Sequence, residues 1–401
     1  VQYKDFSEWR NSNEEQAATK RQESYWLERF AGEVPVLNLP YDFSRPPVQS
    51  FVGSTVSFEF GPDEAAALKQ VALEQEATLF MVLLAVFNVL LSRLSGQEDI
   101  IIGTPTAGRR HADVAGTIGI FVNTLGIRSF PIGEKTFGDF LQEVKRTTLT
   151  AFENQEYQFE DLVEEVEVNR DVSRNPLFDV MFTFQNMENP EIEIPSGLKL
   201  SPYDYKTGIA KFDLTLYSAE AGEKIAFVLE YCTKLFKEAT IDKFINYFKI
   251  LIGEMTGDPH KKISDMQMVP EEEMRQVVFE FNDTEAPYEA GKTISRLFAE
   301  QAEKKPDRIA VIGARHKLTG QAGNRLSLQP VYLTYEKLYR EVDSLARELT
   351  RKGAGPGTIA AIMVERSLEM MVGIFAILKA GGVYLPIDPY YPQSRQEYVI
   401  M

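Results

Sequence analysis

The feature that most constrains the fold is an apolar run from Met81 to Leu91 with a second apolar run shortly after it. Thr78 is a suitable helix cap, so we predict a helix from Leu79 to Leu94. The run contains Asn88 and is too short to cross a bilayer, which indicates a helix buried in a globular core. The second run, "DIIIGTPT", is predicted to be a buried strand.

Strand-like and helix-like segments alternate through about the first 265 residues. Helices are expected after Pro62 and Thr136 and from Ala239 to Met255. Further strands are predicted at "STVSFEF", "IGIFVNTLGIRSF", "FDVMFTF", "FDLTLYSAE" and "KIAFVLEY". This alternation predicts an α/β fold with a mixed sheet.

The chain changes character near residue 265 and again near residue 293. An acidic, proline-containing stretch of weak periodicity, 266–292, is predicted to be an exposed linker between domains 1–265 and 293–401. The second domain has a β-α-β-α-β rhythm, which implies parallel pairing but too few units to close a doubly wound sheet. The polar stretch Arg315 to Gln329 is predicted to be a surface loop.

Charge and cysteine content limit the possible partners and compartment. The formal net charge of −16 argues against binding to nucleic acid or to an anionic membrane, because both need a basic surface. The single cysteine, Cys232, excludes a disulfide framework, suits a reducing cytoplasm and is expected to be buried and inert. No targeting segment is visible. The chain starts at Val1 and stops in "QEYVIM", so we expect both ends to be cut from a longer protein.

The common catalytic motifs are missing from the sequence. Its three histidines, His111, His260 and His316, are far apart and none has metal-ligand spacing with a second His or Cys. No Gly-x-Ser-x-Gly nucleophile elbow occurs. "GTPTAGR" lacks the Lys-Ser/Thr of a phosphate loop, and "GAGPG" precedes a strand instead of a helix.

Three constellations stand out from this background. "GRRHADVAGTIGIFVNTLGIR" places a cationic group, Arg109, and an amide, Asn123, near one place, although a solvated arginine pair before a strand gives the same pattern. "NQEYQFEDL" is a polar helix-breaking segment that ends in a buried aromatic residue. "NRDVSRNPLFDVMF" is a turn that leads into a strand. Taken by themselves, the second and third favour structural roles.

At these residues the sequence resembles the condensation domains of bacterial nonribosomal peptide synthetases. "YKDFSEW", "IGIFVNT", "NQEYQFE" and "RDVSRNPLFDVMF" match successive motifs of that family, in its order and at about its spacing. "FNDTEAPY", "LTYEKLYREVDSLARELTRKG" and "LKAGGVYLPIDPYYP" resemble the start of an amino-acid adenylation domain. The order of these matches across two adjoining domains makes the resemblance specific.

The resemblance implies a fold similar to chloramphenicol acetyltransferase, with two lobes that meet at the active site. The family's His-His-x-x-x-Asp-Gly motif is expected upstream of Val1, and no His-His pair occurs in this chain. By the same resemblance, Arg109 would pair with the Asp of that motif, and Asn123 would lie near the tunnel where the two thioester arms meet. Asn154 stands where the family usually has His, at a position regarded as structural.

The implied function is that of a synthetase segment. The intact protein would join carrier-bound aminoacyl and peptidyl thioesters through an amide bond, and an incomplete α/β adenylation (AMP-binding) subdomain would follow. Phosphopantetheine on upstream and downstream peptidyl carrier domains, and ATP with Mg for the complete adenylation domain, are the implied cofactors, with none bound by this segment. We expect a cytoplasmic protein with neither nucleic acid nor membrane as partner. The alternatives are a non-catalytic scaffold or docking segment, or an epimerisation or cyclisation variant of the same fold.

Overall fold

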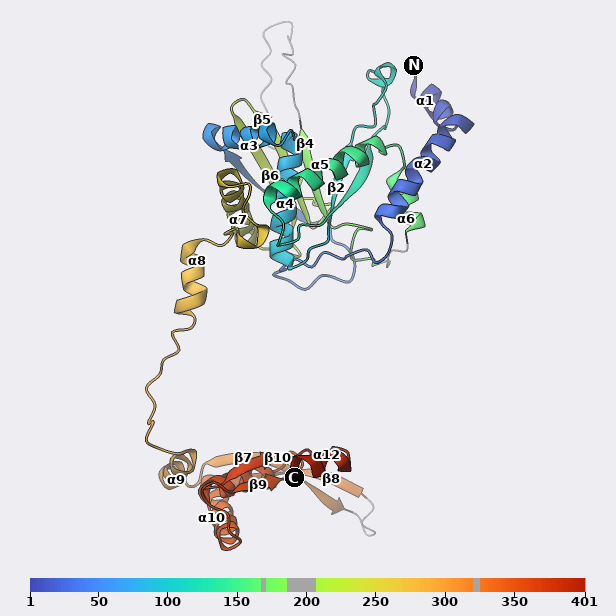
Figure 1. Cartoon of the computed structure of the whole chain (residues 1–401). Helices are drawn as coiled ribbons and strands as arrows, with labels where there is room; N and C mark the ends of the chain where they lie inside the picture. The colour runs from blue at the N-terminus through green and yellow to red at the C-terminus, as the bar shows by residue number, and fades with distance from the viewer. Residues whose placement is uncertain (167–170, 186–206, 320–324, 401) are drawn as a thin grey trace. The chain divides into compact units, whose positions relative to one another are not determined.

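The computed structural model describes residues 1–166, 171–185, 207–319 and 325–400 (Figure 1). The chain forms two compact units, Val1–Asp283 and Thr284–Met401. Each unit has its own apolar core.

The first unit is built on a six-stranded mixed sheet with the order β1-β6-β5-β4-β2-β3. The β2–β4 and β4–β5 neighbours are parallel, and the other neighbours are antiparallel. The strands are β1 (Gly53–Phe60), β2 (Ile100–Thr106), β3 (Asn123–Ser129), β4 (Val180–Gln185), β5 (Leu214–Ala221) and β6 (Lys224–Cys232). The predicted α/β fold with a mixed sheet is confirmed.

Helix α4 (Leu79–Ser95) is the central buried helix of this unit. Thr78 caps it, because its Oγ1 accepts a hydrogen bond from the Met81 amide at 3.3 Å. Gly96 ends it in the left-handed conformation, at φ +70°. Every residue from Met81 to Ser92 is buried, so the expectation drawn from the apolar run is correct.

Helices α3 (Pro62–Glu74), α4, α5 (Phe137–Glu153) and α7 (Glu238–Gly257) pack against the sheet and against one another, and they contribute many of the buried core residues (Figure 1). Thr136 caps α5 as predicted, with its Oγ1 accepting from the Asp139 amide at 3.1 Å. Edge-to-face aromatic contacts link the sheet to α7: the Phe227 ring of β6 meets Phe60 of β1 and Phe248 of α7 in this way. Besides α4, the α-helices up to residue 257 are α1 (Tyr3–Arg10), α2 (Asn13–Arg29), α3 (Pro62–Glu74), α5 (Phe137–Glu153), α6 (Phe159–Glu165) and α7 (Glu238–Gly257).

The segment that follows α7 is partly built into the first unit. Met266 and Met268 are buried in its core. The short helix α8 (Glu271–Arg275) continues into one π-helical turn, Gln276–Glu280, whose apolar side chains are exposed. The domain limits drawn at residues 265 and 293 stay a prediction.

The second unit pairs its strands in two ways. β9 (Ile359–Ile362) and β10 (Val383–Pro386) are parallel and joined through α11 (Leu368–Lys379), as predicted. β7 (Ile309–Thr319) and β8 (Arg325–Thr334) instead form an antiparallel hairpin. The remaining helices are α9 (Ile294–Lys304), α10 (Tyr335–Arg351) and α12 (Gln393–Ile400).

The hairpin makes the predicted surface loop at 315–329 wrong. Arg315 pairs with Gln329, and Thr319 pairs with Arg325, so both flanks of that stretch continue the two strands. A polar composition suggested a loop, but two adjacent antiparallel strands satisfy their backbone groups through each other whatever their side chains are. Residues 320–324 lie outside the described residues.

No single described helix is long and apolar enough to span a bilayer, although α3 and α4 together reach that length and apolarity, with a bend of 103° between them.

Candidate functional site

Arg109 lies in the connection between β2 and β3, residues 107–122, and Asn123 is the first residue of β3. The connection leaves the sheet and returns to the antiparallel neighbour of the strand it left. Gly108 makes the first bend at φ +63°, and a Cβ there would lie 1.9 Å from the Phe121 carbonyl oxygen. Only glycine fits this position, since both its conformation and the space exclude a side chain.

Arg109 holds this connection together from inside. Its Nη1 donates hydrogen bonds to the carbonyl oxygens of Val114 and Thr117, the latter at 2.8 Å. Its guanidinium also lies 4.1 Å from the centre of the Phe121 ring. Within the described part of the chain no carboxylate lies within ion-pair distance of Arg109. In this structure the partners of the Arg109 guanidinium therefore lie in its own loop. The pairing of Arg109 with an aspartate outside the chain stays a prediction.

Helix α1, which carries "YKDFSEW", packs on the same connection. The Tyr3 hydroxyl donates to the Ile120 carbonyl at 2.8 Å, and its ring meets Phe121 edge-on at 5.2 Å. Phe6 contacts Phe121 from the same helix at 4.7 Å. A Cβ on Gly119 would lie 2.2 Å from the Tyr3 ring, so this glycine permits the close approach. Two motifs separated by more than a hundred residues thus form one aromatic cluster.

Asn123 joins a third motif to the start of β3. Its Nδ2 donates to the carbonyl oxygens of Gln155 and Tyr157 at 2.8 and 2.7 Å. Its Oδ1 accepts from the amides of Thr124 and Phe159 at 2.8 and 3.2 Å. The side chain is 5% exposed and uses all its hydrogen-bonding capacity within the chain. Its role in this structure is to position the "NQEYQFE" segment.

The two predicted residues lie at opposite ends of the connection, and in the described structure no hydrogen bond joins their side chains. Between them the chain exposes three apolar side chains, Ile118 (95% exposed), Ile120 (82%) and Val122 (61%). The connection is therefore anchored by its polar and aromatic groups and presents an apolar edge outward. Such an edge suits a protein contact.

The "RDVSRNPLFDVMF" motif contributes a buried charge network that sequence reasoning missed. Arg174 forms an ion pair with Asp179, and Arg45 forms one with Asp213. Tyr41 completes the network, because its hydroxyl donates to Asp213 at 3.0 Å. The network ties the crossover segment before β1 to the starts of β4 and β5.

A sequence signal for this network existed. "FDVMF" and "FDLTL" each place an aspartate directly before an apolar strand, and those strands are parallel neighbours with Val180 opposite Leu214. The two carboxylates are therefore brought to the same edge of the sheet. Burial, and then the charge of Asp213, raise the pKa of Asp179 to about 6. Burial likewise raises the pKa of Tyr41 to about 12.

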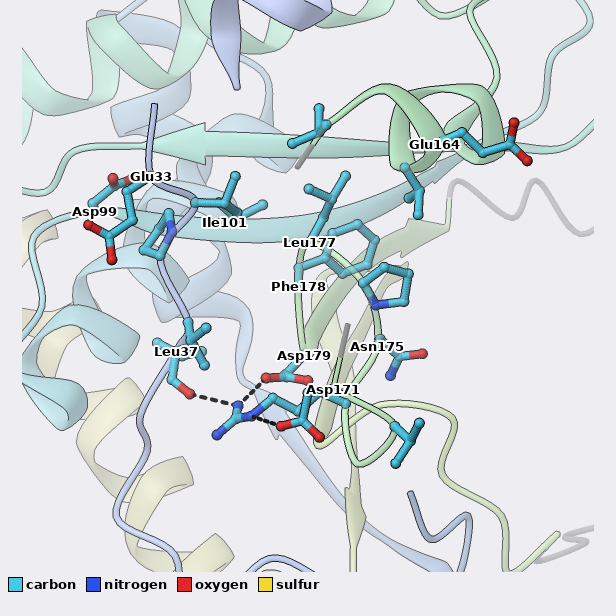
Figure 2. Close-up of a pocket in the computed structure, with 18 residues that line it drawn as sticks. Glu33, Leu37, Asp99, Ile101, Glu164, Asp171, Asn175, Leu177, Phe178 and Asp179 are labelled. Carbon is cyan, nitrogen blue, oxygen red and sulfur yellow. Dashed lines mark hydrogen bonds and ion pairs between the residues drawn. The ribbon is translucent and has the colours of Figure 1, made fainter. Parts of the chain in front are cut away.

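A pocket of about 680 Å³ lies next to this network (Figure 2). Its lining includes Leu177, Phe178 and Asp179 (Figure 2), and Arg174, which also lines it, donates hydrogen bonds to Asp179 and to the Leu37 carbonyl. One oxygen of Asp179, Oδ1, is buried without a hydrogen-bond partner among the described residues. The pocket neither contains nor borders Arg109 or Asn123.

Cys232 and His111 lie outside the charge network and the pocket. Cys232 is buried, as expected, and burial raises the pKa of its thiol. His111 is exposed and contacts the Trp9 ring at 5.6 Å. No cluster of His, Cys, Asp and Glu suited to a metal ion was found in the described parts of the chain.

Family models match the chain in two blocks, "Condensation domain" over residues 1–278 and "AMP-binding enzyme" over residues 298–401. The whole chain is similar to gramicidin S synthase 2 of Brevibacillus brevis (48% identity over 402 residues, 9% of that protein). It is also similar to bacitracin synthase 3 of Bacillus licheniformis (44% over 400 residues, 6% of that protein). The chain thus spans less than a tenth of the length of these two relatives.

Solved structures of peptide synthetases share the fold of this chain. A four-domain nonribosomal peptide synthetase, AB3403, solved with AMP and glycine, matches with a TM-score of 0.73 at 25% identity, over 96% of this chain and 30% of that one. The peptide synthetase FmoA3 matches with a TM-score of 0.65 at 21% identity, over 98% of this chain and 42% of that one.

Proposed function

The chain belongs to the condensation-domain family of nonribosomal peptide synthetases, and we propose that it supplies the end of the N-terminal lobe and the C-terminal lobe of an amide-forming site. In the reaction, the amine of an aminoacyl thioester attacks the carbonyl of a second thioester. A C–N bond forms, the C–S bond breaks, the thiol leaves, and the amine gives up a proton. The attacking amine must be neutral, so a base is needed near it.

The observation that carries the proposal is the convergence of three family-like motifs on the 107–122 connection. Arg109 binds the middle of the connection at the Thr117 carbonyl, and Tyr3 binds its end at the Ile120 carbonyl. Asn123, directly after the connection, binds the Gln155 carbonyl. We assign Arg109 and Asn123 as positioning residues, since their partners here are backbone groups. The catalytic base is not among them, because the His-His motif is absent from this sequence. The chain by itself is expected to be inactive.

The residues after 293 begin an amino-acid-activating domain in this proposal. The AMP-binding family match over residues 298–401 supports it. ATP and Mg would serve that domain when complete, and phosphopantetheine would be carried by the partner carrier domains. Aminoacyl and peptidyl thioesters on those carriers are the proposed substrates, and the cytoplasm is the proposed location.

Reconstitution tests the proposal. The chain is combined with a separately produced lobe that carries the His-His motif, and amide product is measured from two loaded carrier domains. Product is expected from the mixture and from neither part alone. Arg109→Lys keeps the charge but loses the forked donation, so product formation should fall at least about tenfold, a loss of about 1.4 kcal/mol. Arg110→Gln is the matched control, because Arg110 is exposed and its side chain makes one long hydrogen bond, of 3.5 Å, among the described residues.

Two outcomes would contradict the proposal. Peptide formed by the isolated chain would contradict the assignment of the catalytic base to another lobe. Unchanged product formation with Arg109→Lys would remove the positioning role of Arg109.

A non-catalytic docking role is the second candidate, and the exposed edge at Ile118, Ile120 and Val122 is the observation that favours it. Binding of the separate lobe or of a carrier without any product would support docking. Loss of configuration at the substrate α-carbon without amide formation would instead indicate an epimerisation variant.

A further inference from the structure

The two strands that carry the 107–122 connection are both bound, at its two ends, to one residue outside it, Gln155. Thr106 and Asn123 form the last register pair of β2 and β3 before the connection leaves the sheet. Asn123 Nδ2 donates to the Gln155 carbonyl at 2.8 Å, and the Thr106 hydroxyl donates to Gln155 Oε1. We call this pair of contacts the Gln155 bridge.

A third contact determines the orientation of the Gln155 amide. Its Nε2 donates to the Phe152 carbonyl at 2.8 Å, in the last turn of α5. A carbonyl can only accept, so the amide NH₂ faces Phe152 and Oε1 faces the Thr106 hydroxyl, which donates to it. The last four carbonyl groups of a helix have no partner within the helix, so this contact also completes the end of α5.

The backbone on both sides of Gln155 is held by α2. Trp26 Nε1 donates to the Asn154 carbonyl at 2.8 Å, and Gln22 Oε1 accepts from the Glu156 amide at 2.9 Å. Trp26 is 2% exposed, so the first of these contacts is anchored in the core. Gln155 therefore binds the two strands from a fixed position.

The bridge acts on a different part of the connection from Arg109. Arg109 donates to carbonyl oxygens of Val114 and Thr117, and these bonds fix the shape of the loop itself. The bridge holds Thr106 and Asn123, where the loop leaves and re-enters the sheet. The direction in which the loop projects from the sheet depends on these two points.

We propose that Gln155 is a positioning residue for the amide-forming site, because it fixes the two ends of the connection that carries Arg109. This inference rests on the proposed function, since that function places the connection at the site. Gln155 acts through the connection and takes no part in the bond changes. Loss of one buried hydrogen bond of this kind shifts a local equilibrium about fivefold.

Hydrogen exchange of the full chain, followed by mass spectrometry, tests the bridge without any activity. Gln155→Met keeps the length of the side chain and removes its polar contacts, and Thr106→Val keeps the shape and removes the hydroxyl. Each should speed exchange of the 107–122 amides about fivefold. Thr106→Ser keeps the hydroxyl and should exchange as the parent does. The double variant should exchange no faster than Gln155→Met, because both substitutions remove the same bond.

Two controls separate the bridge from a general loss of folding. Peptides of the buried helix α4 should exchange at the parent rate in every variant, whereas partial unfolding would speed them as well. Gln142→Met is the matched control, because Gln142 is a half-buried glutamine of α5 whose Nε2 donates to the Gln75 carbonyl at 2.9 Å, at the end of α3. It should leave exchange in 107–122 unchanged.

Reconstitution with the lobe that carries the His-His motif then measures the effect on the reaction. With saturating loaded carriers, kcat should fall about fivefold for Gln155→Met and Thr106→Val, and KM should change by less than about twofold. Thr106→Ser should restore the parent rate.

Each possible outcome decides one part of the inference. Unchanged exchange in 107–122 overturns the bridge, and Thr106→Val alone decides this if Gln155→Met does not fold. Faster exchange with parent kcat overturns the positioning role. If the parent chain gives no product with the lobe, the proposed function fails, and exchange alone then supports or overturns the bridge.

Discussion

Asp179 and Asp213 stand directly before two parallel strands, and the Asp213 amide donates to the Asp179 carbonyl at 2.9 Å. Two carboxylates are thereby buried at one edge of the sheet, 4% exposed each. Arg45 and Arg174 balance their charge. The arrangement makes the stability of the first unit depend on pH in a defined direction.

We predict that Asp179 lowers the free energy of unfolding as pH rises from about 4 to about 6. Its pKa is raised from 3.8 to about 6 in the folded chain, so over this range the folded state holds a proton that the unfolded state has released. Asp179→Asn should remove this slope in urea unfolding measured at several pH values. Asp171→Asn is the control of opposite sign. Hydrogen bonds from Ser173 lower the pKa of Asp171, so its contribution is present above pH 3.8 and is lost as pH falls below it.

Asn123→Ala should destabilise the first unit by about 2–4 kcal/mol. The substitution leaves two carbonyl oxygens and two amides without their partner in a buried place. Urea unfolding followed by circular dichroism measures the loss. Asn11→Ala removes one exposed hydrogen bond and should change stability by less than about 0.5 kcal/mol. An equal effect of both would show that Asn123 does not position the "NQEYQFE" segment.

Gly108→Ala should open the 107–122 connection. The alanine would have to adopt the left-handed backbone conformation of Gly108, and its Cβ would displace the Phe121 carbonyl. Faster cleavage within the connection by a nonspecific protease is the expected outcome, with little change at other sites. Gly116→Ala, in the same connection but with no atom within 4 Å of the new Cβ, should be cleaved like the parent.

Asn88→Leu should stabilise the first unit by about 1 kcal/mol. Asn88 is completely buried in α4, its Nδ2 donates to the Leu84 carbonyl at 2.8 Å, and its Oδ1 has no partner among the described residues. An apolar side chain of similar size removes the unsatisfied oxygen. A higher urea midpoint with an unchanged slope is expected, and a lower midpoint would show that the Asn88 amide stabilises α4.

Local features of the structure follow from local sequence. The caps at Thr78 and Thr136 were predicted because a capping side chain acts within a few residues of its own position. The strands at "FDVMFTF" and "KIAFVLEY" were found because alternation and β-branched content are also local.

Pairing between distant segments was less predictable. The hairpin of β7 and β8 was missed because composition describes polarity, whereas a strand is defined by the neighbour it pairs with. The Asp213–Arg45 pair was missed for a similar reason, since Arg45 is 168 residues from Asp213.

By itself the sequence determined the alternation of strands and helices, the buried helix α4 and, through its motifs, the resemblance to peptide synthetases. Only the tertiary structure decided which groups Arg109 and Asn123 bind. Arg109 donates to its own loop, and Asn123 donates to a segment more than thirty residues away. The physical reason is that a polar side chain takes the partners that folding brings within about 3 Å of it, and the order of residues along the chain does not specify them.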